Sequence, residues 1–339
     1  MAITPPNERY QMAELLSAIR KAKTVLLFTH VSPDGDTLGS AMALQMMLKK
    51  LGKHVIPVLD GVVPSALSFL PSVDSLRSPR ELAGQVDEMD AGTLAVAVDV
   101  SSENRLGEAE ALFHSAQLTA QLDHHETNPG YARINLIDAT APATAILVAR
   151  LQTAMDLPLE QEEAICLYTA LSTDTGNFGY QNTTAEAFRL MSSLMEVGLP
   201  LAKYSRMIFK RKERLFVNLL GKALSTLAFF HCGEIAGMQV SCQEMRSVGA
   251  TSEHTDGVVD YAIDTAGVKI AYFARETEEG GTKLSLRALP PHRVDEVAAF
   301  FGGGGHQLAA GCTVPLPMAE AVKQVQELLV EVLEGSREK

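Results

Sequence analysis

The feature that most constrains the fold is a series of short apolar segments in the N-terminal part of the chain. They lie at residues 24–29, 53–59, 93–98 and 118–122, with helical periodicity between them. Strands that lack a polar face and alternate with helices are typical of a parallel sheet covered on both sides. We therefore predict an α/β fold here, in which ligands bind beyond the carboxyl ends of the strands.

Three of these segments end on acidic or histidine side chains, and a helix predicted over residues 162–172 ends beside a further acid. The side chains concerned are His30, Asp34, Asp36, Asp99, Asp123, His124, His125 and Asp174. A single aspartate after a strand is commonly a turn former. So many acids at strand ends are harder to explain in that way, because the carboxyl ends of parallel strands meet at one edge of the sheet.

Histidine nitrogen combined with carboxylate oxygen suits a divalent ion such as Mn²⁺, Mg²⁺, Co²⁺ or Fe²⁺. Two ionised carboxylates about 4 Å apart repel each other by roughly 4 kcal/mol at an effective dielectric near 20, so a cation between them would be stabilising. One ion needs about three or four protein ligands, and the sequence offers more. We therefore predict two ions about 3.5–4 Å apart, with a shared carboxylate and a bridging water, the arrangement used for in-line attack on phosphorus.

A second motif, FFGGGGHQLAAGC, occupies residues 300–312. Its four consecutive glycines predict a loop outside helices and strands, with backbone N–H groups that face an anion. His306 follows directly and can donate to a phosphate or a carboxylate. A flexible surface loop is the alternative, but the neighbouring phenylalanines and the AAG sequence favour close packing. The motif is not a P-loop, because no Lys-Ser or Lys-Thr pair follows the glycines.

The composition limits the class of protein and its partners. A length of 339 residues favours two domains. No apolar run approaches the roughly 20 residues that span a bilayer, and the N-terminus does not resemble a secretory signal. Four widely spaced cysteines predict reduced thiols in a cytoplasmic protein. A net charge of −12 argues against long duplex DNA but allows a short phosphorylated ligand bound through metal ions.

The second half of the chain differs in its predicted secondary structure. The segment FKRKERLFVNLLGKAL predicts a connecting helix, and short strands such as IAGMQVSC and VKIAYFARE follow it. The sequence EEGGT indicates a hairpin turn between two of these strands. We place a first domain at residues 1–185, a helical connector at 186–222 and a smaller α/β domain at 223–339.

Five motifs, taken in order, resemble those of the DHH/DHHA1 phosphoesterases. They are HVSPDGDTLGS, VAVD, DHH, STDTGNF and FGGGGHQLAAG, and the resemblance covers the chain from about residue 24 to residue 312. Within this superfamily the chain is similar to the short bacterial members of the NrnA type, which are oligoribonucleases and pAp phosphatases. The resemblance implies an N-terminal parallel-sheet DHH domain joined by a helical connector to a smaller α/β DHHA1 domain.

The resemblance also implies roles for individual residues. One metal ion would be held by His30, Asp34 and Asp99, and the other by Asp36, Asp99, His124 and Asp174. Asp123 would orient a neighbouring histidine, and His125 would face the scissile phosphate. In the second domain, the groups implied to hold the terminal phosphate and sugar of the substrate are Arg287, Gly302, Gly303, Gly304, Gly305 and His306.

The activity implied is that of a phosphodiesterase with two divalent ions, Mn²⁺ or alternatively Mg²⁺ or Co²⁺. It would cut very short RNA one nucleoside monophosphate at a time and dephosphorylate pAp. Cyclic dinucleotides and linear pApA are alternative substrates, and a non-catalytic nucleotide-binding module is a rival from another class. The sequence leaves open the ranking of these substrates, the polarity of cleavage, the metal used in the cell and whether the chain forms a homodimer.

Overall fold

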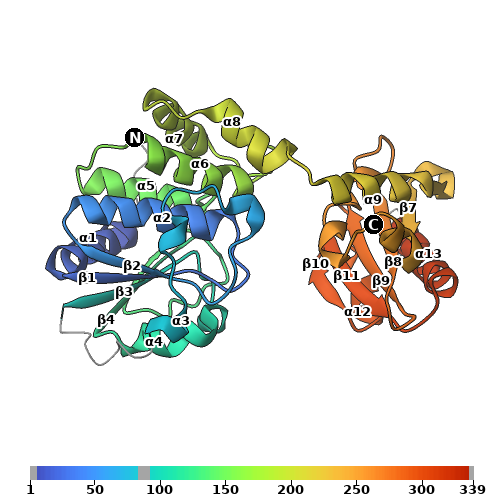
Figure 1. Cartoon of the computed structure of the whole chain (residues 1–339), viewed down its shortest axis with the longest axis horizontal. Coiled ribbons are helices and arrows are strands. Elements are labelled where there is room, and N and C mark those ends of the chain that lie inside the picture. Colours follow the sequence, from blue (N-terminus) through green and yellow to red (C-terminus); the bar gives the residue numbers. More distant parts are fainter. Residues whose placement is uncertain (1–5, 83–91, 336–339) are drawn as a thin grey trace. The chain divides into compact units, whose positions relative to one another are not determined.

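The computed structural model describes residues 6–82 and 92–335 of the chain. The chain divides into two compact units, Met1–Arg211 and Lys212–Lys339, each built around one sheet (Figure 1). In the segment predicted as a connector, α7 (Ala185–Glu196) and α8 (Leu201–Ser205) belong to the first unit, whereas α9 (Arg214–Ser225) belongs to the second. The domain boundaries drawn from the sequence at residues 185 and 222 stay a prediction.

The sheet of the first unit has five parallel strands in the order β2-β1-β3-β4-β5. This confirms the predicted parallel α/β fold. The fifth strand was not predicted, because its four residues, INLI, are too few to show a pattern. The strands are β1 (Thr24–Phe28), β2 (His54–Val58), β3 (Thr93–Val98), β4 (Leu118–Asp123) and β5 (Ile134–Ile137).

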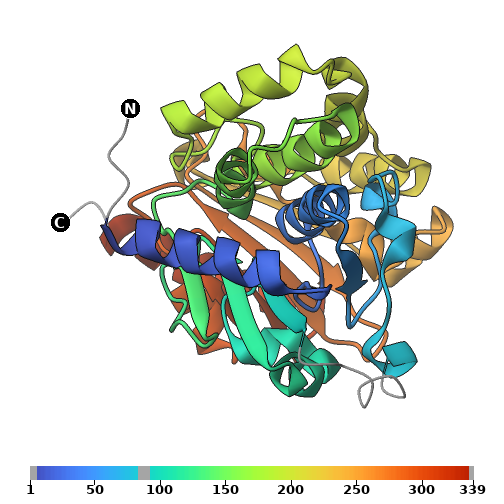
Figure 2. The same ribbon diagram turned by 90° about the vertical axis from the view of Figure 1, so that its left-hand side faces the viewer.

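Successive residues of the strands face two separate cores, as expected for a sheet covered on both sides. On β1, Val25 and Leu27 pack in one core, and Leu26 and Phe28 pack in the other. Helices α1 (Pro6–Lys21), α2 (Gly35–Lys50), α5 (Thr144–Ala154) and α6 (Gln161–Asp174) cover the first face. Helices α3 (Pro79–Leu82) and α4 (Glu110–Ser115), with the 3₁₀ helix η4 (Glu103–Ala109), cover the second face. Figure 2 shows α1 beside the edge strand β5.

The direction of winding reverses between β1 and β3, where a crevice for ligands is expected in a sheet of this strand order. Helix α2 begins at this point and α6 ends there. The two helices pack closely side by side. A Cβ atom at Gly39 of α2 would clash with the carbonyl oxygen of Cys166, and one at Gly35 would clash with the side chain of Thr173. Glycine on α2 therefore allows α6 to bring its last residue, Asp174, to the crevice.

The second unit contains a six-stranded sheet in the order β10-β11-β9-β8-β7-β6, in which only β7 and β8 pair in parallel. Its strands are β6 (Ala228–Phe230), β7 (Ile235–Val240), β8 (Ile270–Glu276), β9 (Thr282–Ala288), β10 (Gly304–His306) and β11 (Ala309–Val314). The helices are α9, α10 (Cys242–Ser247), α11 (Asp260–Ile263), α12 (Asp295–Phe300) and α13 (Met318–Gly335). The predicted smaller α/β module is confirmed. Among the described residues, no helix combines the length and the apolar character needed to cross a bilayer.

The glycine-rich segment is only in part the loop that the sequence predicts. Gly304 and Gly305 lie in β10, an exposed strand at the edge of the sheet that pairs antiparallel with β11. Two of the four glycine positions have no room for a side chain, because a Cβ atom at Gly303 or Gly305 would clash with the backbone of β11. The prediction that consecutive glycines exclude a strand is therefore wrong: here they allow two backbones to approach closely.

Candidate functional site

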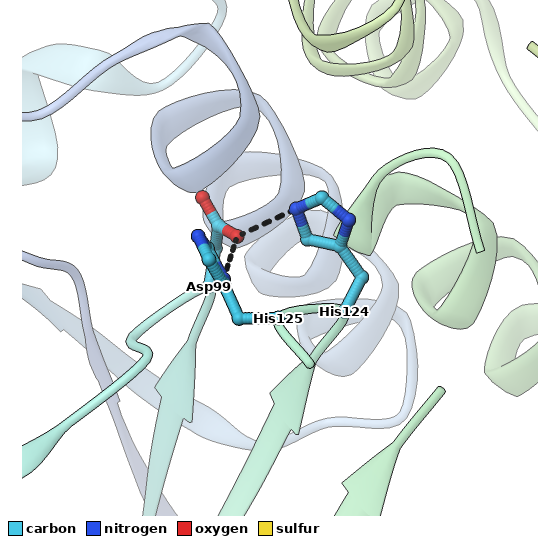
Figure 3. Close-up of side chains that lie close together, drawn as sticks. All are labelled: Asp99, His124 and His125. Carbon is cyan, nitrogen blue, oxygen red and sulfur yellow. Dashed lines mark ion pairs between the residues drawn. The ribbon is translucent and has the colours of Figure 1, made fainter. Parts of the chain in front are cut away.

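The residues predicted for the site in the first unit all lie at the carboxyl edge of its sheet, at the ends of strands and helices. His30 follows β1, Asp99 follows β3, and Asp123, His124 and His125 lie at the end of β4; Asp34 and Asp36 begin α2, and Asp174 ends α6. Figure 3 shows how Asp99 and the two neighbouring histidines converge from adjacent strands. The parallel sheet therefore gathers groups that are far apart in the sequence, as predicted.

The start of α2 orients two of the carboxylates. Asp34 is the N-cap residue and accepts hydrogen bonds from the N–H groups of Asp36 and Thr37, at 3.0 and 3.1 Å. Asp36 is buried and accepts hydrogen bonds from the N–H of Thr144 at 2.6 Å and from the hydroxyl of Ser40 at 2.9 Å. Burial, followed by the charge of Asp174, raises the pKa of Asp36 to about 7. The charge of His124 offsets this rise only in part.

His30 forms one group of ligand-type atoms. Its Nδ1 lies 2.8 Å from the carbonyl oxygen of Val31. Its Nε2 lies 3.5 Å from Oδ2 of Asp34 and 3.8 Å from Oδ2 of Asp99. When Nδ1 donates to Val31, the lone pair of Nε2 faces both carboxylates, which is the orientation of a metal-binding imidazole.

His124 forms a second group in the same way. Its Nδ1 lies 3.2 Å from the carbonyl oxygen of Ala141. Its Nε2 lies 3.3 Å from Oδ2 of Asp174, 3.6 Å from Oδ1 of Asp99 and 3.8 Å from Oδ2 of Asp36. Three carboxylates therefore surround one imidazole nitrogen.

Asp99 connects the two groups, because Oδ1 faces His124 and Oδ2 faces His30. The residue is 2% exposed and has a φ of 61°, a left-handed conformation that is uncommon outside glycine. The hydroxyl of Thr144 donates to Oδ1 at 3.0 Å. Burial, with the neighbouring charge of Asp36, raises the pKa of Asp99 well above its usual value. A cation would offset the cost of this buried negative charge.

The donor set fits divalent cations. Three clusters have their ligand-type atoms within 4.8 Å of one another: His30, Asp34 and Asp99; Asp36, His124 and Asp174; and Asp99, His124 and His125. Carboxylate oxygen and imidazole nitrogen are suitable ligands for Mn²⁺ and related ions. The cluster of acidic and histidine side chains could therefore hold a divalent metal ion.

Asp123 accepts hydrogen bonds from three donors in its surroundings. It is fully buried and accepts hydrogen bonds from Nδ1 of His125 at 2.7 Å, from the N–H of His124 at 2.9 Å, and from the side-chain amide of Asn128. The hydrogen bond to Asp123 raises the pKa of His125. Asp123 thus orients His125 and favours its protonated form.

Sequence reasoning missed several residues that complete this arrangement. Thr144 binds Asp36 and Asp99, Asn128 binds Asp123, and Nη2 of Arg105 lies 3.0 Å from Nδ1 of His30. All three are single polar residues outside the motifs. No local pattern distinguishes them from ordinary surface residues.

In the second unit, Arg287 and His306 lie on one face of the sheet. Both pair in register with Ala309 of β11, Arg287 from β9 and His306 from β10, and residues directly opposite each other share a face. The small side chain of Ala309 lies between them. Nε of Arg287 donates to Asp260 at 3.0 Å. The structure therefore brings together two of the predicted binding residues.

The predicted role of the glycine backbone needs a correction. The N–H groups of Gly302 and Gly303 donate to the carbonyl oxygens of Ala299 and Ala298, at 2.9 and 2.8 Å. These bonds satisfy the C-terminal end of α12, so neither N–H is free to bind an anion.

Comparisons with known proteins agree with the site. The model of the DHH family, N-terminal domain, matches residues 24–171, and that of the DHHA1 domain matches residues 237–335. A Thermus thermophilus protein named bifunctional oligoribonuclease and PAP phosphatase NrnA is 33% identical over 336 residues, which cover 97% of each chain.

Two solved structures show the same fold. An exopolyphosphatase-related protein from Bacteroides fragilis has a TM-score of 0.86 and 25% identity, and the match covers 98% of each chain. RecJ from Thermus thermophilus in complex with Mn²⁺ has a TM-score of 0.51 and 16% identity. That match covers 96% of this chain and 54% of RecJ, and it supports the fold alone.

Proposed function

The chain belongs to the DHH/DHHA1 phosphoesterase family, and we propose that it hydrolyses short oligoribonucleotides to nucleoside monophosphates and dephosphorylates pAp. It is a hydrolase of phosphoester bonds. The names of its relatives support the choice of substrates, since the Thermus thermophilus and Bacillus subtilis proteins are both named oligoribonuclease and PAP phosphatase. The strongest support from the site is the position of Asp99, with one carboxylate oxygen toward each of two metal-binding histidines.

We assign one divalent ion to His30, Asp34 and Asp99 and a second to Asp36, Asp99, His124 and Asp174. The clustering of these ligand atoms supports the assignment. Mn²⁺ is the proposed metal, with Mg²⁺ or Co²⁺ as alternatives. When bound, such ions supply charge stabilisation for the phosphoryl oxygens and a nucleophilic water at neutral pH.

His125 is proposed as the residue that faces the scissile phosphate. Its Nδ1 proton is held by Asp123, so a second proton on the ring resides at Nε2. The hydrogen bond to Asp123 raises the pKa of His125 and so favours the form that carries this proton. The imidazolium can stabilise a phosphoryl oxygen and then donate the proton to the leaving oxygen.

We assign substrate binding to the second unit. The guanidinium of Arg287 has a planar fork suited to phosphate oxygens, and exposed His306 lies on the same sheet face. Gly304 and Gly305 at the exposed edge leave room for a sugar, whereas Gly302 and Gly303 contribute through the shape of the turn. Binding energy from such remote contacts helps to orient the reacting phosphate.

Linear pApA and cyclic dinucleotides contain the same kind of reacting bond and are the alternative substrates. A non-catalytic nucleotide-binding module is disfavoured, because the complete set of ligand types converges in one site. The test is hydrolysis of an RNA dinucleotide, pAp, pApA and a cyclic dinucleotide by the purified protein with Mn²⁺. We expect the RNA dinucleotide and pAp to be turned over, and chelation with EDTA to stop both reactions. Turnover in excess EDTA, or of cyclic dinucleotides alone, would contradict the proposal.

A further inference from the structure

Arg105 brings a positive charge to the carboxylate cluster, and none of the roles described above uses it. It lies in η4, the 3₁₀ helix that follows the strand ending at Asp99. Its backbone is fixed on both sides: its carbonyl oxygen accepts from the N–H of Val31 at 2.8 Å, and its N–H donates to Ser102 at 3.0 Å. Nη2 of its side chain lies 3.0 Å from Nδ1 of His30.

Two other arginines of the first unit have carboxylate partners. Arg80 pairs with Glu108 at 2.6 Å, and Arg150 pairs with Asp138 at 2.7 Å. Within residues 6–82 and 92–335, no carboxylate lies at ion-pair distance from Arg105. Its guanidinium therefore remains available for an external anion.

The contact between Arg105 and His30 depends on which histidine nitrogen carries the proton. Nδ1 of His30 faces two groups with opposite requirements: the carbonyl oxygen of Val31, which needs a donor, and Nη2 of Arg105, which needs an acceptor. When Nε2 acts as a metal ligand, the proton resides on Nδ1 and is donated to Val31. Nη2 of Arg105 then faces another donor and has lost its acceptor.

We propose that Arg105 is a further substrate-binding residue, which binds a non-bridging oxygen of the reacting phosphate when His30 is engaged as a metal ligand. The inference rests on the proposed phosphoesterase function and deepens it. Arginine suits the role because its charge is permanent and its N–H groups match phosphate oxygens in pairs. The tautomer of His30 would couple metal binding to phosphate binding, since the tautomer that binds a metal through Nε2 no longer accepts a hydrogen bond from Arg105.

A purely structural alternative is that Arg105 positions the ring of His30. The two roles predict opposite effects on metal affinity. Loss of a positioning residue weakens metal binding. Loss of a substrate-binding arginine removes a nearby positive charge and a competitor for Nδ1, so metal binding stays equal or becomes tighter.

The experiment compares wild type, Arg105→Ala and Arg105→Lys, with Arg80→Ala as the matched control from an exposed ion pair. Calorimetry measures the affinity for Mn²⁺, and then the affinity of the Mn²⁺-loaded protein for AMP. Kinetics with an RNA dinucleotide give kcat and KM. Thermal melts check that each variant is folded.

For Arg105→Ala we expect unchanged or tighter Mn²⁺ binding, AMP binding weaker by about 10- to 100-fold, and kcat/KM lower by a similar factor, as for loss of a charge-assisted hydrogen bond. Arg105→Lys should lie between Ala and wild type, and Arg80→Ala should match wild type. Weaker Mn²⁺ binding in Arg105→Ala, or AMP binding equal to wild type, would overturn the inference. Failure of the wild type to cleave any of the proposed substrates would overturn the proposed function instead, and the AMP comparison would still decide the role of Arg105.

Discussion

The two units present their polar groups in opposite ways. In the first, His30, Asp36, Asp99 and Asp123 are at most 2% exposed, at the edge of a parallel sheet. In the second, His306 is exposed on a largely antiparallel sheet, and Arg287 is half-buried. Buried charge is costly without compensation, whereas exposed groups remain solvated until a ligand arrives. This contrast supports the proposal that the first unit carries out cation-dependent chemistry and that the second unit binds the substrate.

The largest expected effect comes from removing the carboxylate of Asp99, which lies between the two histidines proposed as metal ligands. Asp99→Ala should lower kcat by more than about a thousandfold, or roughly 4 kcal/mol in the barrier, with both the RNA dinucleotide and a small chromogenic phosphodiester. The control is Asp74→Ala, which removes an exposed acid of the same unit. Steady-state kinetics and bound-metal analysis check the result. A variant that keeps a tenth of the wild-type rate would show that Asp99 does not connect two ions.

The next effect should distinguish the role of the second unit from that of the first. Arg287→Ala should lower kcat/KM by about 10- to 100-fold for the RNA dinucleotide and for pAp, because a charge-assisted hydrogen bond to phosphate is lost. The small chromogenic diester should be cleaved at close to the wild-type rate. The matched control is Arg246→Ala, an exposed arginine of the same unit that pairs with Glu278. Equal slowing with both substrates would assign Arg287 to folding or to chemistry, and it would contradict a division of roles between the two units.

A smaller effect should follow from the edge of the second sheet. Gly305 has a φ of 147°, and a Cβ atom there would clash with β11, whereas Gly304 has open space around it. Gly305→Ala should lower the free energy of unfolding of the second unit by about 1–2 kcal/mol and weaken binding of the RNA dinucleotide. Gly304→Ala should leave the free energy of unfolding unchanged, because a Cβ atom there would meet no neighbouring atom. Thermal melts and KM measurements check the pair, and equal behaviour of the two variants would contradict the packing described here.

The last effect concerns the pH dependence of stability. Burial raises the pKa of Asp36 to about 7, so between about pH 4 and pH 7 the folded metal-free protein binds more protons than the unfolded chain. Its free energy of unfolding should therefore fall as pH rises through this range, by at most about 1.4 kcal/mol per pH unit for one such group. Saturating Mn²⁺ should remove or reverse the trend, because bound ligands are deprotonated. Denaturant titrations at several pH values with and without Mn²⁺ measure this. The same trend in Asp36→Asn would show that another group is responsible.

Much of the first unit could be predicted from sequence. Apolar strands without a polar face identify a parallel sheet, and the rule that ligands bind at its carboxyl edge then places Asp99 and the DHH residues close together. Strand β5 escaped prediction because four residues carry little pattern. Asp174, expected just after a helix, is the last residue of α6.

The second unit was harder to predict in detail. The predicted strands and the hairpin turn indicated the α/β fold class of this unit. The glycine segment, however, was predicted as a loop that binds an anion through its backbone. Whether Gly302 has a free N–H depends on Ala299 at the end of α12. That both Arg287 and His306 face Ala309 depends on the register of three strands. A local sequence pattern determines neither.

The chemistry available to this protein can be read from the sequence: the types of candidate metal ligand, their place at strand ends and the glycines that allow close backbone approach. These follow from local periodicity and from the common direction of parallel strands. The orientation of the groups depends on the tertiary structure. One oxygen of Asp99 faces each histidine, and Thr144, 45 residues away in the chain, donates to Asp99. Arg105 likewise reaches His30 from the 3₁₀ helix η4. Such contacts depend on the packing of distant segments, because hydrogen bonds and metal sites require positions accurate to a fraction of an ångström.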